Sequence, residues 1–214
     1  GRGGLRRLKL TPGWISIVLI TIMVISSLPV IAFSAELNKL VPLPDILLKM
    51  EQDAEILTRA FLKSDGIGDL LLNLLVVAVA AAVTEEVFFR GCLQRVLQGL
   101  TKNPHFAIWI TAFLFSLLHF QFLGFIPRML LGGVMGYLFY WTGSLWAPIF
   151  AHFVNNGIGV LVNYLIQRGS LTSEVETYGN SSADWIGVAT GTSIMLLILL
   201  VIKKKNQATL TDLR

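Results

Sequence analysis

The chain has 214 residues, of which 54% are hydrophobic and only 14% are charged. Soluble domains carry about 25% charged residues, and one of this size could not bury so much apolar surface. The composition excludes a disordered chain and an ordinary cytosolic enzyme, and the single cysteine excludes a disulfide scaffold. We therefore expect an integral membrane protein.

Six apolar runs approach the length of about 20 helical residues that crosses the hydrocarbon core of a bilayer. They lie at 14–33, 70–89, 105–122, 125–141, 145–166 and 185–202. The predicted fold class is an all-α, polytopic transmembrane helix bundle with about six spans. An even number of spans puts both termini on one side of the membrane.

The first run, 14–33, follows basic residues and precedes Ala32-Phe33-Ser34, which resembles a signal-peptide cleavage site. Because signal peptides have only about 7–15 apolar residues in their core, we interpret the run as a retained span. The loop 35–68 then carries apolar residues at helical spacing with charges between them. We expect an amphipathic helix there, either on the membrane surface or packed on the end of the bundle.

Two later features concern helix packing. Asn103 followed by Pro104 is typical of the start of a helix, with a cap and then proline in the first turn. Gly132 and Gly136 are four residues apart in the run 125–141, and such pairs of small residues form close contacts between membrane helices.

Basic residues are divided unevenly between the two sides of this bundle. Eleven of the 17 lysines and arginines would lie on the side of the termini and six on the opposite side. Cytoplasmic loops of membrane proteins are enriched in Lys and Arg. The predicted localisation is therefore a multi-pass protein of a bacterial cytoplasmic membrane with both termini in the cytoplasm.

Ionisable and amide side chains inside apolar runs are costly in a bilayer and usually mark function. Here they are Glu85, Glu86, Arg90, His119, His152, Asn155 and Asn156. Helical spacing places Arg90 four residues from Glu86, so these two can pair. Glu85 points to a different face and stays free for another role.

Depth in the membrane also groups these residues. Glu85 lies 17 residues before residue 102, the expected centre of a helical hairpin, and His119 lies 17 residues after it. In two regular antiparallel helices these side chains would lie at the same height. His152 and Asn156 share a helix face, and Asn155 lies almost on it, so spacing does not choose between the asparagines.

This set of side chains suits hydrolysis of an amide. A carboxylate such as Glu85 in a dry site, beside a histidine, can act as a general base on water. The pair of His152 and Asn156 can supply hydrogen bonds to a developing oxyanion. The pattern predicts a water molecule attacking an amide carbonyl, without a serine or cysteine nucleophile.

Three motifs here resemble a known family. Glu85-Glu86-Val87-Phe88-Phe89-Arg90 is similar to its EExxxR motif, Phe115-xxx-His119 to its FxxxH motif, and His152-xxx-Asn156 to its HxxxN motif. The family is that of the CAAX proteases and bacteriocin-processing or immunity proteins, which includes the type II CAAX prenyl endopeptidase. The resemblance covers about residues 70–165.

The resemblance implies a glutamate-type intramembrane endopeptidase that needs neither a metal nor another cofactor. It implies that Glu85 and His119 activate the water, that His152 and Asn156 form the oxyanion hole, and that Glu86 and Arg90 support the site. The expected partners are membrane lipids and a protein or peptide substrate, possibly with a lipid-modified C-terminus, and no nucleic acid.

We accordingly divide the chain into three parts. Residues 1–68 hold the first span and the amphipathic outer loop, 69–166 the catalytic transmembrane core, and 167–214 an outer loop, the last span and a basic tail. Three alternatives remain at this point. They are a zinc metalloprotease with Glu85, His119 and His152 as ligands, a non-catalytic immunity or scaffold protein of the same fold, and a proton-coupled transporter that uses the two glutamates.

Overall fold

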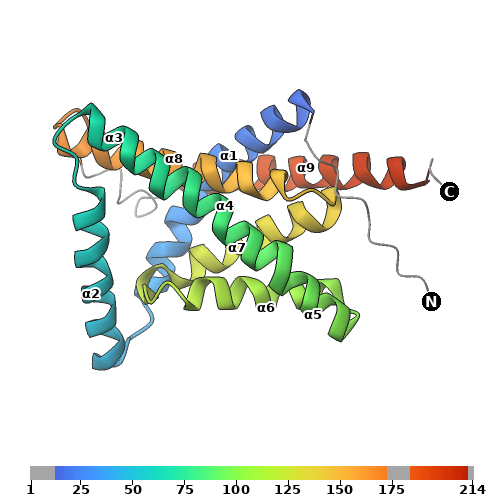
Figure 1. The fold of residues 1–214 in the computed structure, drawn as a ribbon, viewed down its shortest axis with the longest axis horizontal. Helices are drawn as coiled ribbons and strands as arrows, with labels where there is room; N and C mark the ends of the chain where they lie inside the picture. Colours follow the sequence, from blue (N-terminus) through green and yellow to red (C-terminus); the bar gives the residue numbers. More distant parts are fainter. Residues whose placement is uncertain (1–12, 173–183, 212–214) are drawn as a thin grey trace.

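The computed structural model describes residues 13–172 and 184–211, and these residues form helices joined by short turns (Figure 1). The N-terminal helices are α1 (Trp14–Lys39), α2 (Asp45–Leu62) and α3 (Ile67–Asn73). Next come η1 (Leu74–Ala80), α4 (Ala81–Glu86), η2 (Val87–Leu93) and α5 (Gln94–Thr101), then α6 (Pro104–Leu117) and η3 (Phe122–Gly124). The chain ends with α7 (Phe125–Thr142), α8 (Trp146–Gln167) and α9 (Asp184–Thr211). The predicted all-α bundle is confirmed.

Within residues 13–172 and 184–211, five helical segments are long and apolar enough to cross a membrane. They are Trp14–Lys39, Ile67–Thr101, Phe122–Thr142, Trp146–Gln167 and Asp184–Lys205. The protein is therefore a multi-pass membrane protein. The basic residues Arg2, Arg6, Arg7, Lys9 and Arg214, which entered the prediction of orientation, lie outside the described residues.

The expected span 105–122 is wrong in its length. The helix α6 has 14 residues and ends at Leu117, which gives it about 21 Å at 1.5 Å per residue, less than the roughly 30 Å of a hydrocarbon core. Phe120 then adopts a positive φ of 56°, and the chain turns into η3. The apolar residues Phe122 and Leu123 continue the hydrophobic pattern past this turn, so the pattern could not reveal it.

The long segment Ile67–Thr101 is helical throughout but not uniformly α-helical. Two stretches, η1 and η2, are π-helices, and they flank the short α-helical stretch α4 that carries Glu85 and Glu86. A π-helix changes the rotation of the residues that follow it, and such insertions are frequent at functional sites. The two glutamates therefore lie in a short α-helical segment. The π-helical turns on either side set the directions in which their side chains point from the helix axis.

Packing joins α1, α7, α8 and α9 through one apolar cluster. Its fully buried members include Ile20 and Met23 of α1, Leu138 of α7 and Ala151 of α8, with Ile198 of α9 also buried against them. The first and last spans thus pack against the segment that carries the polar motifs. Their contact leaves α4 and α8 side by side in the interior.

Small residues bring α6 and α7 into close contact, as the sequence predicted. A Cβ atom at Gly132 would lie 3.2 Å from the Cα atom of Ala112, and one at Gly136 would lie 2.8 Å from Ile108 Cγ2. Because the glycines have no side chain, the backbone of α7 reaches α6 at this point.

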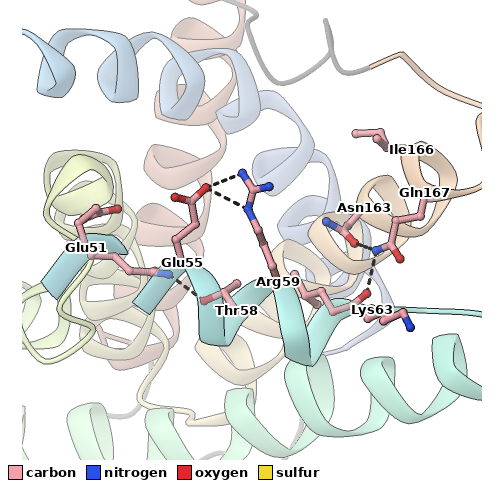
Figure 2. Close-up of a pocket in the computed structure, with 10 residues that line it drawn as sticks. Glu51, Glu55, Thr58, Arg59, Lys63, Asn163, Ile166 and Gln167 are labelled. Atoms are coloured by element: carbon pink, nitrogen blue, oxygen red, sulfur yellow. Dashed lines mark hydrogen bonds and ion pairs between the residues drawn. The ribbon is translucent and has the colours of Figure 1, made fainter. Parts of the chain in front are cut away.

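The helix α2 is amphipathic and stands apart from the spans. In Figure 1 it runs across the direction of α8 at the edge of the bundle, and none of its residues is buried. Its apolar side chains Ile56, Leu57 and Phe61 are exposed. Its polar side chains Glu51, Glu55, Thr58 and Arg59 line a hollow that also includes the end of α8 (Figure 2). This geometry fits a helix that lies at the membrane surface with its apolar face toward lipid.

We predict that Gly191→Ala weakens the contact of α9 with α1. A Cβ atom at this position would clash with the backbone carbonyl oxygen of Ser26, and such overpacking costs about 1–3 kcal/mol. The measurement is thermal unfolding in detergent, followed by tryptophan fluorescence. Gly99→Ala is the control, because a Cβ atom there meets no atom within 4 Å and removing a helical glycine favours the helix. Equal melting temperatures for the two variants would contradict the packing described.

Candidate active site

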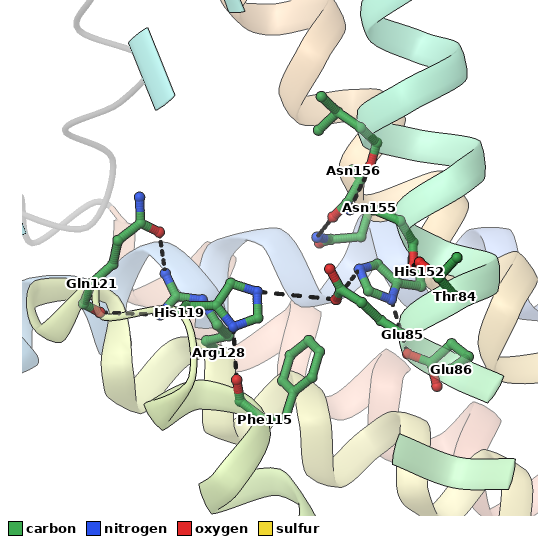
Figure 3. A network of polar contacts seen from close by, with 12 residues as sticks. Thr84, Glu85, Glu86, Phe115, His119, Gln121, Arg128, His152, Asn155 and Asn156 are labelled. Atoms are coloured by element: carbon green, nitrogen blue, oxygen red, sulfur yellow. Dashed lines mark hydrogen bonds and ion pairs between the residues drawn. The ribbon is translucent and has the colours of Figure 1, made fainter. Parts of the chain in front are cut away.

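One cavity of ≈ 680 Å³ brings together the four residues that the sequence predicts to be catalytic, Glu85, His119, His152 and Asn156. They come from α4, from the turn after α6 and from α8 (Figure 3). His119 lies two residues beyond the end of its helix, not inside it. Glu85 and His119, which the sequence predicted to lie at the same height, nevertheless have their side chains 4.0 Å apart.

Beneath this cavity lies a fully buried ion pair. Arg90 Nη1 donates to Glu86 Oε1 over 2.7 Å, and both side chains have 0% exposure. Arg90 Nη2 also donates to the carbonyl oxygen of Gly132 over 2.9 Å. The predicted pairing of Glu86 with Arg90 is therefore confirmed, and it ties the second span to α7.

The same glutamate orients His152. Its Oε1 atom lies 2.8 Å from His152 Nδ1. Because an ionised carboxylate only accepts hydrogen bonds, Nδ1 carries the proton and donates. In a neutral imidazole the other nitrogen, Nε2, is then an acceptor, and it faces Glu85 Oε2 at 3.8 Å.

His119 is held in the same way by the backbone. Its Nδ1 atom lies 2.7 Å from the carbonyl oxygen of Phe115, which can only accept, so Nδ1 donates and Nε2 is free to accept. Burial, and after it the charge of Arg128, lowers the pKa of His119 to about 4, because the imidazolium loses solvation. His119 is therefore neutral at pH 7.

Glu85 is thus the centre of a small acceptor-rich space. Its Oε2 atom is buried and has no hydrogen-bond partner among the described residues. The Nε2 atoms of His119 and His152 lie 4.0 and 3.8 Å from it, too far for direct hydrogen bonds. A water molecule among these three acceptors could donate its two hydrogen bonds to two of them at a time.

The two asparagines of α8 differ in their contacts, which the sequence could not tell. Asn156 Nδ2 donates to the carbonyl oxygen of Val77 over 3.0 Å, and Val77 belongs to the π-helix η1. Asn155 Nδ2 donates to Asn156 Oδ1 over 3.3 Å. Asn155 therefore orients Asn156, whose amide keeps a second N–H for another acceptor.

The turn that carries His119 depends on a residue from the first helix. Asn38 of α1 is buried, donates to the carbonyl oxygen of Phe122 over 2.8 Å and accepts from the backbone N–H of Ile126 over 2.8 Å. Ser116 Oγ donates to the carbonyl oxygen of Phe125 over 2.7 Å. These bonds pair backbone groups of η3 and of the first turn of α7, where helices have unpaired N–H groups. Sequence reasoning missed Asn38, since one asparagine at the end of a span carries no pattern.

Phe115 supports the site from below. Its ring lies 4.9 Å from the ring of His119 and 5.9 Å from that of His152, both edge to face, and 4.8 Å from the guanidinium carbon of Arg90. One aromatic side chain therefore packs against both histidines and the buried cation. The first residue of the Phe115-xxx-His119 motif has a positioning role.

A hollow on the polar face of α2 adjoins this cavity, because Leu62 and Asn163 line both. Its other walls include Gln121 and Gln167, which is seen in Figure 2. The cavity therefore opens toward the end of the bundle where α2 lies.

As for metals, the described residues contain no group of three or more His, Cys, Asp or Glu side chains arranged to hold an ion.

Comparison with known proteins finds a family to which the central part of the chain is similar. Residues 67–158 match the family described as type II CAAX prenyl endopeptidase Rce1-like. This part of the chain, less than half of its 214 residues, is therefore similar to the Rce1-like family. The match runs from α3 into α8 and includes each of the residues Glu85, Glu86, Arg90, His119, His152 and Asn156.

One curated protein, the uncharacterized protein YpbD of Bacillus subtilis (strain 168), is 29% identical over 90 residues. The match covers 40% of this chain and 43% of YpbD, so the chain spans less than half the length of that relative. No solved structure matches the chain significantly.

We predict that Glu86→Gln destabilises the protein by about 3–5 kcal/mol, because it leaves Arg90 buried without a counter-charge. The double variant Glu86→Gln with Arg90→Met should lose less stability than the two single changes together, since it removes the orphaned charge as well. Denaturant unfolding in detergent measures both effects. Strictly additive losses would show that the pair is not coupled.

Proposed function

We propose that this protein is an intramembrane endopeptidase that uses Glu85 to activate water. The observation that carries the proposal is the buried Glu85 Oε2 atom, which has no hydrogen-bond partner among the described residues and faces Nε2 of His119 and of His152. The family of residues 67–158 supports peptide hydrolysis as the chemistry.

The proposed reaction is a single addition of water to an amide. A water molecule donates hydrogen bonds to Glu85 Oε2 and His119 Nε2. Its oxygen attacks the carbonyl carbon of the scissile bond. Glu85 takes the proton that the water loses. When the C–N bond breaks, Glu85 returns that proton to the leaving amine, and the products are a carboxylic acid and an amine.

In this proposal the oxyanion that forms on the carbonyl is stabilised by α8. Asn156 offers its remaining amide N–H, and Asn155 and the Val77 carbonyl hold that amide in place. His152 is the second residue placed at the oxyanion in this proposal, and the contact of its Nδ1 atom with Glu86 fixes the orientation of the ring. Glu86 and Arg90 are positioning residues in this scheme.

We further propose that the protein acts in a bacterial cytoplasmic membrane with both termini in the cytoplasm. The uneven distribution of basic residues supports this orientation, and the bacterial origin of the matched relative supports the source. The cavity would then open on the outer side, where α2 lies.

We predict that Glu85→Gln lowers proteolysis at least about 100-fold, as expected for loss of a general base, and that His119→Ala does the same. The assay uses the protein in detergent or liposomes with a prenylated C-terminal peptide and a digest of membrane proteins, read by mass spectrometry. Glu36→Gln is the matched control, because Glu36 is on α1 and pairs only with Lys39 in the described structure.

Each arm is repeated with a strong zinc chelator. Cleavage that survives chelation and disappears in Glu85→Gln supports the proposal. Cleavage lost on chelation favours a metalloprotease in which Glu85, His119 and His152 are ligands. A folded wild type that cleaves nothing while Glu85→Gln changes nothing favours a non-catalytic protein of the same fold.

A further inference from the structure

A second arginine at the candidate site, Arg128, has surroundings unlike those of Arg90. It lies in the first turn of α7 and lines the same cavity as Glu85 and His119. Its Nη1 atom donates to the carbonyl oxygen of Gln121 over 3.0 Å, and its Nη2 atom to the side-chain oxygen of Gln121 over 2.8 Å. Both acceptors are neutral, whereas Arg90 has a carboxylate.

Within the described part of the chain, Arg128 forms no ion pair. Glu51 and Glu85 attract it only from a longer distance, and Glu51 accepts a hydrogen bond from the backbone N–H of Leu123. A guanidinium has five N–H donors, and two are used here. Charges removed from water are normally paired. Arg128 has no carboxylate within ion-pair distance among the described residues, so its charge is available to an anion that enters the cavity.

There is room for an anion beside this guanidinium. Gly124 also lines the cavity, and a Cβ atom there would lie 3.0 Å from Arg128 Nη2. A side chain at position 124 would therefore crowd Nη2, whereas glycine leaves this part of the ≈ 680 Å³ cavity unfilled. In Figure 3 His119 lies between Arg128 and Glu85, so the free donors are close to the proposed reacting groups.

We propose that Arg128 binds a carboxylate of the peptide substrate, close to the bond that is cleaved. This inference rests on the proposed function and adds a substrate class to it. An anionic group entering the cavity is repelled by Glu85, and Arg128 offsets that repulsion and supplies paired N–H donors, the geometry that suits a carboxylate. The carboxylate can be the C-terminus of the substrate or an Asp or Glu side chain near the scissile bond.

A purely structural role makes a different prediction. If Arg128 only holds the turn that carries His119, through Gln121, then its loss weakens every peptide equally. If it binds a carboxylate, its loss weakens only the anionic peptides. The decisive quantity is therefore the ratio of affinities for anionic and neutral peptides, and not the activity.

The experiment measures binding to the full chain in neutral detergent, in the Glu85→Gln background so that nothing is cleaved. Three short fluorescent apolar peptides are compared by fluorescence anisotropy: one with a free C-terminal carboxylate, one with a C-terminal amide, and one amidated peptide with an internal aspartate. We expect one or both anionic peptides to bind at least about tenfold more tightly than the neutral one.

The added substitution Arg128→Met should abolish that preference and leave the affinity for the neutral peptide unchanged. Arg128→Gln is the second variant, since it keeps N–H donors without the charge, and it should lose the preference too. Arg168→Met is the matched control, because Arg168 is exposed at the end of α8, stacks on Tyr164 and does not line the cavity. It should retain the preference.

Absence of any preference, its persistence in Arg128→Met, or an equal loss for all three peptides would overturn the inference. The identity of the favoured anionic peptide tells whether the carboxylate is terminal or internal. Failure of the proposed function looks different. In that case the wild type cleaves none of the peptides, whereas the binding preference and its dependence on Arg128 remain measurable.

Discussion

The structure depends on one buried carboxylate, Glu86. Its Oε1 atom accepts from Arg90 over 2.7 Å and lies 2.8 Å from His152 Nδ1, and Arg90 continues the chain of contacts to the backbone of Gly132. Three membrane helices are therefore joined by side chains that have almost no contact with solvent. In a bilayer no water could replace these partners, so helix packing and the orientation of the His152 ring are fixed together.

Around this centre the two adjacent glutamates, Glu85 and Glu86, have different surroundings. Glu86, one residue from Glu85, is completely buried and paired, while Glu85 is 30% exposed and borders the cavity. The π-helices on both sides of α4 set the rotation of this pair. Two adjacent residues of the same type thereby have opposite environments, and only one is available to a substrate.

The second organising feature is the early end of α6. A helix that continued to residue 122, as hydropathy suggests, would carry His119 within a regular span. Instead the chain turns, and Asn38, Ser116 and Arg128 supply the hydrogen bonds that the turn requires. The first helix, which lies outside the segment that matches the family, thus helps to position a histidine of the site.

The sequence by itself determined the class of protein, the helical bundle and the Glu86–Arg90 pair, because these follow from hydropathy and from spacing along a single helix. It also predicted that Glu85 and His119 lie at the same depth, but on the assumption that both are in regular helices. It could not determine where α6 ends, which nitrogen of each histidine donates, or how the two asparagines divide their contacts. It also gave no signal for Asn38 or Arg128. Each of these is decided by partners far away in the chain, through hydrogen bonds and charges that exist only once the helices have packed.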